Sequence, residues 1–245
     1  MCSSDLAYIV GILTLSLPLH AGPFMDVETG PVFTGKNDAR ISGRYGTRFS
    51  LPGTLWNRPA PYIRARVGWT IKERHTISFL AAPLNVEYYG TSSRYLLFRN
   101  RLIVPHAPVQ ANFKFNSWRL TYRYDIVKND TIEFGLGLTG KIRDAYIRLD
   151  SLGVRTTRPD LGFVPLINVR LQWMFVPNLS FLLDADWLVG PQGRAEDILV
   201  ALQRHVGKHM VFKIGYRILE GGADNKSVYT FSLFHYAVFG ATMKY

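Results

Sequence analysis

The amino-acid sequence predicts an all-β protein, a closed antiparallel up-and-down transmembrane β-barrel of about ten strands. Three observations predict this fold class. Apolar and polar residues alternate with a period of two along most of the chain, short and long connections follow each other in turn, and the chain ends on a long aromatic strand pattern. No run of 18 consecutive apolar residues occurs, which excludes a helical membrane protein.

The N-terminal segment reads as an export signal. Residues 7–21, AYIVGILTLSLPLHA, form the one continuous apolar stretch, and it ends on a small residue as a cleavage site does. We therefore expect residues 1–21 to be a signal peptide and residues 22–245 to be a single barrel domain. Residues 1–6, MCSSDL, lack the Lys or Arg of a signal peptide, so we expect them not to be native coding sequence. The single cysteine, Cys2, would be removed with the signal, which excludes disulfides and thiolate metal sites.

The strand-like segments follow in order along the chain. In the first, RISGRYGTRFS (residues 40–50), the side chains of Ile41, Tyr45 and Phe49 are expected to face outward. The same alternation recurs in residues 62–72, 117–127, 132–142, 163–175, 179–189, 210–218 and 229–245. An amphipathic soluble strand has this period too, but four tryptophans fall on the apolar face near expected strand ends, as an interfacial girdle requires: Trp69, Trp118, Trp173 and Trp187.

Connection lengths support an up-and-down order. Short connections are expected at residues 72–75, 127–130, 176–178 and 206–209, and longer ones at 51–61, 89–110, 145–159, 189–194 and 220–227. Strict alternation places both chain ends on the periplasmic side. Residues 80–109 have room for a further hairpin, so the expected strand number lies between eight and twelve.

The inward face is strongly basic in a chain with 29 Lys and Arg against 18 Asp and Glu. In the narrow bore of a ten-stranded barrel, such charges must pair or contact water. The preferred interpretation is a structural network of ion pairs, and the alternative is a narrow pore that favours anions. The expected network comprises Arg44, Arg64, Arg66, Arg119, Arg123, Asp125, Glu133, Arg170, Asp184, Asp186, Lys213 and Arg217, with Arg48, Lys141 and Asp197 on the same face.

The last strand carries a family resemblance. Its residues Phe239, Ala241, Met243 and Tyr245 resemble the C-terminal signal of bacterial outer-membrane barrels, which implies recognition by the barrel-assembly machinery. The segments KNDARISGRYGTRFSL, FKFNSWRLTYRYDI, TGKIRDAYIRL, GFVPLINVRLQW, LLDADWLVGPQGRAEDIL and GYRILEGGADNKSVYTFSLFHYA resemble an uncharacterised family of bacterial outer-membrane β-barrel proteins. The resemblance implies the bacterial outer membrane as location, and lipids and lipopolysaccharide as neighbours of a monomer. It supplies no activity.

The sequence contains few residues in arrangements that indicate an enzyme active site. His235 interrupts the outward face of the last strand, as in a lipid hydrolase with a site at the barrel rim, but Ser232 points to the opposite face and no G-x-S-x-G is present. No Asp–His pairing matches that of an omptin-like protease. We therefore expect a structural barrel or a narrow passive pathway without metal or cofactor, and keep a hydrolase of lipid A or phospholipid as the alternative. Membrane-type alternation argues against a nucleic-acid partner despite the net charge of +11.

Overall fold

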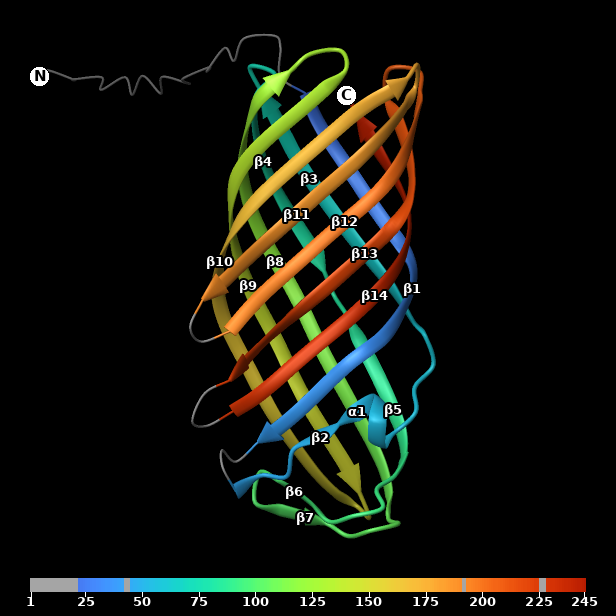
Figure 1. Ribbon diagram of the computed structural model, residues 1–245, viewed down its shortest axis with the longest axis vertical. Helices are drawn as coiled ribbons and strands as arrows, with labels where there is room; N and C mark the ends of the chain where they lie inside the picture. The colour runs from blue at the N-terminus through green and yellow to red at the C-terminus, as the bar shows by residue number, and fades with distance from the viewer. Residues whose placement is uncertain (1–21, 42–44, 191–192, 225–227) are drawn as a thin grey trace, which may run out of the picture.

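The computed structural model describes residues 22–41, 45–190, 193–224 and 228–245, and shows a tall barrel of antiparallel strands (Figure 1). The expected signal peptide and Arg44 lie outside the described residues. The elements in chain order are β1 (Gly22–Ile41), β2 (Phe49–Ser50), α1 (Leu51–Thr54), β3 (Ala60–Ile71), β4 (His75–Ala82), β5 (Asn85–Thr91), β6 (Leu96–Phe98), β7 (Arg101–Ile103), β8 (Pro108–Lys128), β9 (Ile132–Ser151), β10 (Val154–Val176), β11 (Leu179–Gly190), β12 (Gly193–Val206), β13 (Met210–Asp224) and β14 (Val228–Lys244). No described helix is long and apolar enough to cross a bilayer.

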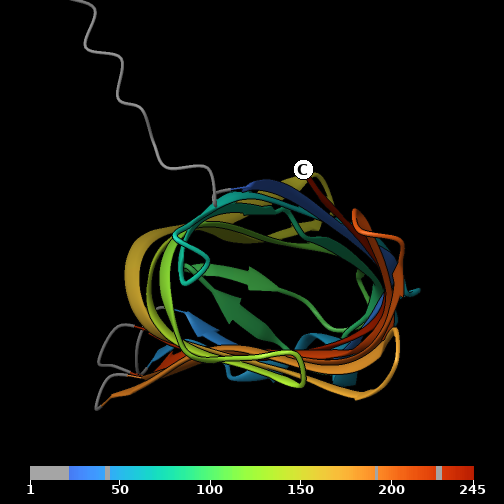
Figure 2. The same cartoon turned by 90° about the horizontal axis from the view of Figure 1, so that it is seen from above.

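The barrel closes because β14 pairs with β1 along nearly its whole length. Neighbours in sequence pair in turn around the ring seen in Figure 2. β4 and β5 act as one strand interrupted at Pro83, since both pair with β8. The ring therefore has ten strands, and the predicted fold is confirmed. The further hairpin considered within residues 80–109 exists as β6–β7, but it forms a separate two-stranded sheet.

The two ends of the barrel differ. At the end that we call the terminal end, the first and last described strands meet, with the backbone N–H of Tyr245 donating to the carbonyl of Pro23 at 3.1 Å, and short turns join β3–β4, β8–β9, β10–β11 and β12–β13. At the opposite end, the loop end, lie α1, β2 and the β6–β7 hairpin (Figure 1). The side chains of Leu96 and Phe98 in that hairpin are fully buried, so it closes the loop end.

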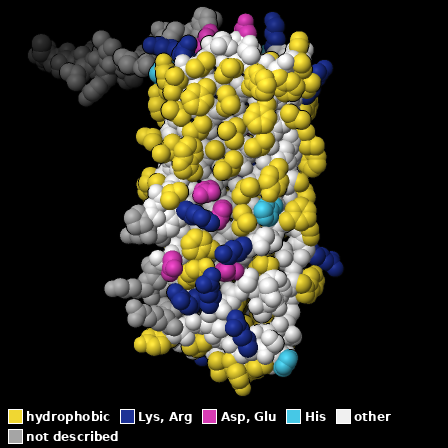
Figure 3. All heavy atoms as spheres, in the orientation of Figure 1, with side chains coloured by type: hydrophobic (Ala, Val, Ile, Leu, Met, Phe, Trp, Pro, Cys, Tyr) yellow, Lys and Arg dark blue, Asp and Glu magenta, His cyan; other side chains and the backbone are white. Residues whose placement is uncertain are grey.

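The outer surface of the terminal half is apolar. On β9, the outward side chains of Leu136, Leu138 and Ile142 are 42%, 70% and 50% exposed, whereas Thr139 and Lys141 between them are buried in the bore. Figure 3 shows this apolar band running around the visible face of the terminal half. Such a band matches the lipid-facing surface of a transmembrane barrel.

The pattern reverses in the loop half. Beyond Ile142 the outward residues of β9 become Asp144 and Arg148, while Ile147 and Leu149 point inward and are buried. The interior of the loop half is consequently an apolar core, formed by Val32, Ile41, Phe49, Leu51, Leu55, Tyr62, Val86, Tyr88, Leu96, Phe98, Phe113, Ile147, Leu149, Leu219 and Phe234, among others. This half is built like a water-soluble protein, with its apolar side chains inside.

The reversal corrects two expectations from the sequence. Ile41 and Phe49, expected to face outward, are each 3% exposed and lie in the core. Residues 145–159, expected to be a long loop, are strand apart from a two-residue turn at Leu152 and Gly153, both with positive φ. Both errors have one cause: outside the bilayer the outer wall faces water, so the strands continue with the opposite polarity.

Candidate functional site: the ionic bore

The bore of the terminal half begins as an open vestibule. A cavity of about 250 Å³ opens at the terminal end. Charged side chains dominate its lining: Arg66, Arg123, Lys128, Arg170, Lys213 and Lys244 against Asp26, Glu73, Asp125 and Glu133. Cations therefore outnumber carboxylates at this mouth.

Deeper in the bore, on the loop side of the vestibule, ion pairs centred on Asp197 of β12 fill the space. Its carboxylate lies 3.0 Å from Nη2 of Arg64, 2.6 Å from Nη2 of Arg119 and 2.5 Å from Nη1 of Arg217. These four side chains come from β3, β8, β12 and β13, and each residue is at most 3% exposed. One carboxylate thus links four strands across the bore.

Glu28 of β1 is the second centre of this network. Its carboxylate lies 2.7 Å from Nη2 of Arg217, 2.7 Å from Nζ of Lys213 and 3.6 Å from Nε of Arg64. Lys213 in turn contacts Asp26 at 2.8 Å. Because Arg64 and Arg217 contact both Glu28 and Asp197, the two centres form one layer, which we call the ion-pair layer.

Two further carboxylates complete the ion-pair layer on β11. Asp186 lies 2.8 Å from Nη1 of Arg119 and also accepts hydrogen bonds from Thr139 and Asn168. Asp184 lies 2.7 Å from Nη1 of Arg66 and 3.9 Å from Nη1 of Arg170. Because buried charges are tolerated only when paired and hydrogen-bonded, these contacts let the layer fill the bore.

The structure brings together most of the network expected from the sequence. Arg64, Arg66, Arg119, Asp184, Asp186, Lys213 and Arg217 lie in the ion-pair layer, and Arg170 at its edge. Arg123 and Asp125 pair with each other at 3.0 Å in the vestibule. Two of the expected residues lie elsewhere: Glu133 is at the vestibule mouth, 3.8 Å from Lys128, and Arg48 faces outward in the loop half, beside Asp38.

Sequence reasoning missed two members, Asp26 and Glu28. The expected first strand began at Arg40, whereas β1 starts at Gly22. A brief alternation in FMDVE could have revealed this part of β1, since its acidic residues fall on one face and Met25 and Val27 on the other. Gly30 and Pro31 interrupt that alternation, which hides the strand.

Among the described residues, no serine, threonine or cysteine side chain hydrogen-bonds to the catalytic candidate His235. Its ring lies on the outer wall and hydrogen-bonds the hydroxyl of Tyr216, while Ser232 points inward and donates to Asn37 at 3.1 Å. A serine–histidine contact that the sequence did not reveal occurs at the terminal end, where Ser180 Oγ lies 2.8 Å from His205 Nε2. Ser180 is fully buried, so no substrate reaches its hydroxyl.

The four expected interfacial tryptophans are all on the outer wall. Trp69 and Trp173 lie near the terminal end, 44% and 48% exposed. Trp118 and Trp187, 38% and 37% exposed, lie further toward the loop end. Along the outer face of β8, Asn116 on the loop side of Trp118 is polar, whereas the outward residues on its other side are apolar. Trp118 therefore lies at the border of the apolar band.

The expected assembly signal occupies the outward face of β14. Phe239 and Tyr245 are 51% and 72% exposed, while Ala241 and Met243 between them are half-buried. Phe239, Ala241 and Met243 lie in the part of β14 that closes the barrel against β1, and Tyr245 follows directly after this strand.

Comparison with solved structures shows which known proteins share this fold. The outer-membrane protease OmpT of Escherichia coli superposes with a TM-score of 0.59 at 9% identity, covering 91% of this chain and 97% of that one. The β-domain of the Bordetella autotransporter BrkA gives 0.49 at 8% identity, covering 92% and 98%. No protein-family model and no curated protein matches the chain. The superposition on OmpT shows that this chain has the fold of an outer-membrane β-barrel protein, and the apolar band around its terminal half fits that fold.

Proposed function

We propose that the protein is a non-conducting outer-membrane barrel with a structural role, its terminal end in the periplasm and its loop half outside the cell. The observation that carries the proposal is the ion-pair layer. Arg64, Arg119 and Arg217 converge on Asp197 from three strands, and all four residues are almost fully buried. A bore filled in this way supports closure to ions.

The closure is stable for electrostatic reasons. Separating one partner from a buried ion pair costs about 3–5 kcal/mol, because the remaining charge stays desolvated. Opening the layer requires several such separations at once. Even then, the apolar core around Phe98 and Phe113 would still obstruct the loop half.

The outer wall just beyond the apolar band supports contact with lipopolysaccharide. Arg48 lies 4.1 Å from the ring centroid of Tyr229, and Lys36 and Arg194 lie 5.9 Å from that of Phe231. Figure 3 shows Lys and Arg side chains mixed with Asp and Glu side chains in an area below the apolar band. We expect the phosphates of outer-leaflet lipids to bind the cations there, and β14 to engage the barrel-assembly machinery during insertion of the monomer.

Planar-bilayer recording tests the closed bore. Protein refolded from the purified chain is added to a bilayer in 1 M KCl, with a heat-unfolded sample of the same protein as the control. We expect no unitary current steps from either sample. Steady steps with anion selectivity from the folded protein alone would contradict the structural role and favour the narrow anion pathway.

A further inference from the structure

The wall of the loop half has a gap beside β10. β10 pairs with β9 from Val154 to Trp173, but with β11 only from Ile167 onward. Among the described strands, the second edge of its segment 154–166 therefore has no partner. This segment contains two prolines, Pro159 and Pro165. Proline is tolerated at a strand edge that makes no backbone hydrogen bonds to a neighbouring strand.

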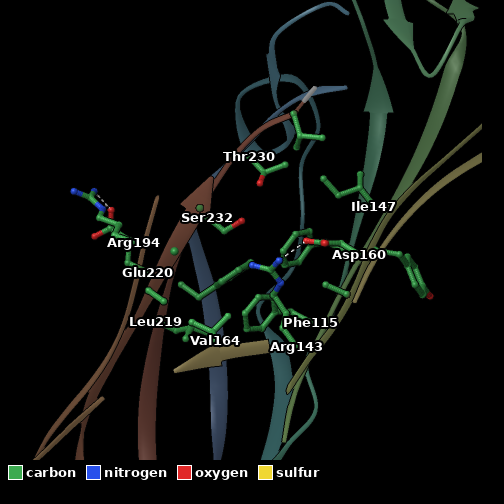
Figure 4. A pocket seen from close by; sticks show the side chains of 18 of the residues that line it. Phe115, Arg143, Ile147, Asp160, Val164, Arg194, Leu219, Glu220, Thr230 and Ser232 are labelled. Atoms are coloured by element: carbon green, nitrogen blue, oxygen red, sulfur yellow. Dashed lines mark hydrogen bonds and ion pairs between the residues drawn. The ribbon is translucent and has the colours of Figure 1, made fainter. Parts of the chain in front are cut away.

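A cavity of about 80 Å³, which we call the side chamber, lies at this gap. Residues of β9 and β10 line it together with residues of β12, β13 and β14; Figure 4 shows Arg143 and Asp160 from the first group across from Leu219 and Ser232 of the second. The lining is mainly apolar, with Phe113, Phe115, Ala145, Ile147 and Phe234 in addition. The chamber has room for about five to eight water molecules, which limits a ligand to a small one.

Lys141 points into the side chamber without an acceptor. The residue is 3% exposed, and its Nζ atom lies 4.9 Å from the ring centroid of Phe115. It makes no ion pair or hydrogen bond with any residue that the structure describes, and its register neighbour on β8 is another cation, Arg119. Two carboxylates, Asp160 and Glu220, also line the chamber, but neither pairs with Lys141. A buried ammonium group without a directly paired anion is costly, and the carboxylate of a ligand can supply that partner.

Arg143, two residues further along β9, adds a second cationic donor. Its Nη2 atom pairs with Asp160 at 2.8 Å, but its buried Nε–H has no acceptor among the described residues. Lys141 and Arg143 thus present unused hydrogen-bond donors beside an apolar cavity. This combination suits a carboxylate attached to a short hydrocarbon chain.

The surface around the gap offers a route for such a molecule. The outward side chains of Leu161 and Phe163 on β10 and Val189 on β11 are 76%, 69% and 69% exposed. Phe163 pairs with Ile142, the last aliphatic outward residue of β9, so these groups extend the apolar surface from the band to the edge of the gap. An amphiphile in the outer surface of the membrane therefore meets the chamber sideways, without passing the ion-pair layer.

We propose that the side chamber binds a single-chain amphiphilic carboxylate of about eight carbons, with its carboxylate at Lys141 and Arg143 and its chain against Phe113, Phe115 and Phe234. The proposal goes beyond the structural role, because it assigns a ligand site to a barrel whose bore is closed. The ligand enters and leaves through the wall, between β10 and the strands β12–β14. No covalent step is involved.

Calorimetric titration of octanoate into the full chain, refolded and held in amphipol, tests the site. We expect saturable binding to the unaltered protein, and binding at least ten-fold weaker to Lys141→Met, which keeps the length of the side chain and removes its charge. Lys114→Met is the matched control, since Lys114 lies on the outer wall in a surface pair with Asp144, and it should bind as the unaltered protein does. Octan-1-ol and propionate, which lack the charge and the chain respectively, should each bind at least ten-fold more weakly than octanoate.

Folding of Lys141→Met is checked separately by heat-modifiable gel migration. Removing an unpaired buried cation should leave that migration unchanged. Absence of saturable octanoate binding to the unaltered protein would overturn the proposal. Equal affinity of octanoate for the unaltered protein and a folded Lys141→Met would overturn it as well.

Discussion

At the scale of single residues, the bore depends on a few carboxylates that each serve several arginines. Asp197 contacts Arg64, Arg119 and Arg217, so its loss would leave three buried guanidinium groups with one fewer partner. For most strands of the terminal half the sequence predicted which side chains point inward, because strand periodicity decides that once the strand is recognised. Which carboxylate lies at the centre depends on the register between strands, and a single strand pattern contains no register information.

Asp197→Ala should lower the free energy of unfolding by about 3–5 kcal/mol, because it breaks buried ion pairs and leaves their cations desolvated. Asp150→Ala is the control, since the Asp150–Arg155 pair at 2.7 Å lies on the surface. Exposed pairs contribute about 0–1 kcal/mol. Urea unfolding in lipid vesicles measures both, and equal losses for the two variants would contradict the central role of Asp197.

Tyr245→Asp should sharply reduce the amount of protein inserted in cells and only slightly affect refolding in detergent. The reason is that Tyr245 is exposed at the end of β14, where it closes the proposed assembly signal but buries little area. Membrane-fraction abundance and heat-modifiable migration give the two readouts, with Tyr245→Phe as the neutral control. Normal insertion of Tyr245→Asp would exclude the terminal residue from the signal.

At the scale of elements, β9 shows what strand patterns can and cannot predict. Its first eleven residues alternate as a membrane strand, and this part was predicted correctly. Its last part, from Ala145 onward, was expected to belong to a loop over residues 145–159. The strand persists there because Phe113, Ile147 and Leu149 pack in a core that forms only when the barrel closes, and this core is not visible in one strand.

Leu138→Arg should cost about 2–4 kcal/mol, since an arginine there faces lipid near the middle of the apolar band. Tyr146→Arg lies on the same face of the same strand, eight residues further toward the loop end. Its position faces water, so it should change stability by less than about 0.5 kcal/mol. Unfolding in lipid vesicles compares the two, and a similar cost at both sites would place the membrane border beyond Tyr146.

At the scale of the whole molecule, two halves of opposite polarity share one set of strands. The terminal half has lipid outside and paired charges inside, and the loop half has water outside and an apolar core inside (Figures 1 and 3). The number of strands, their antiparallel order and the closing pair followed from the sequence. The length of the strands beyond the apolar band did not follow from it. A strand that leaves the bilayer keeps its alternation and only changes which face is apolar, so the sequence pattern does not show that the strand continues.

The central claim, that only the terminal half is embedded in lipid, is tested most directly by an environment-sensitive dye attached along the outer face of β9. Because Cys2 is the only cysteine, a Cys2→Ser background accepts single cysteines at Leu138, Ile142, Asp144, Tyr146 and Arg148 in turn. In lipid vesicles, dye emission should be blue-shifted and lipid-like at positions 138 and 142, and water-like from 144 to 148. Lipid-like emission at Arg148, or water-like emission at Leu138, would contradict the claim.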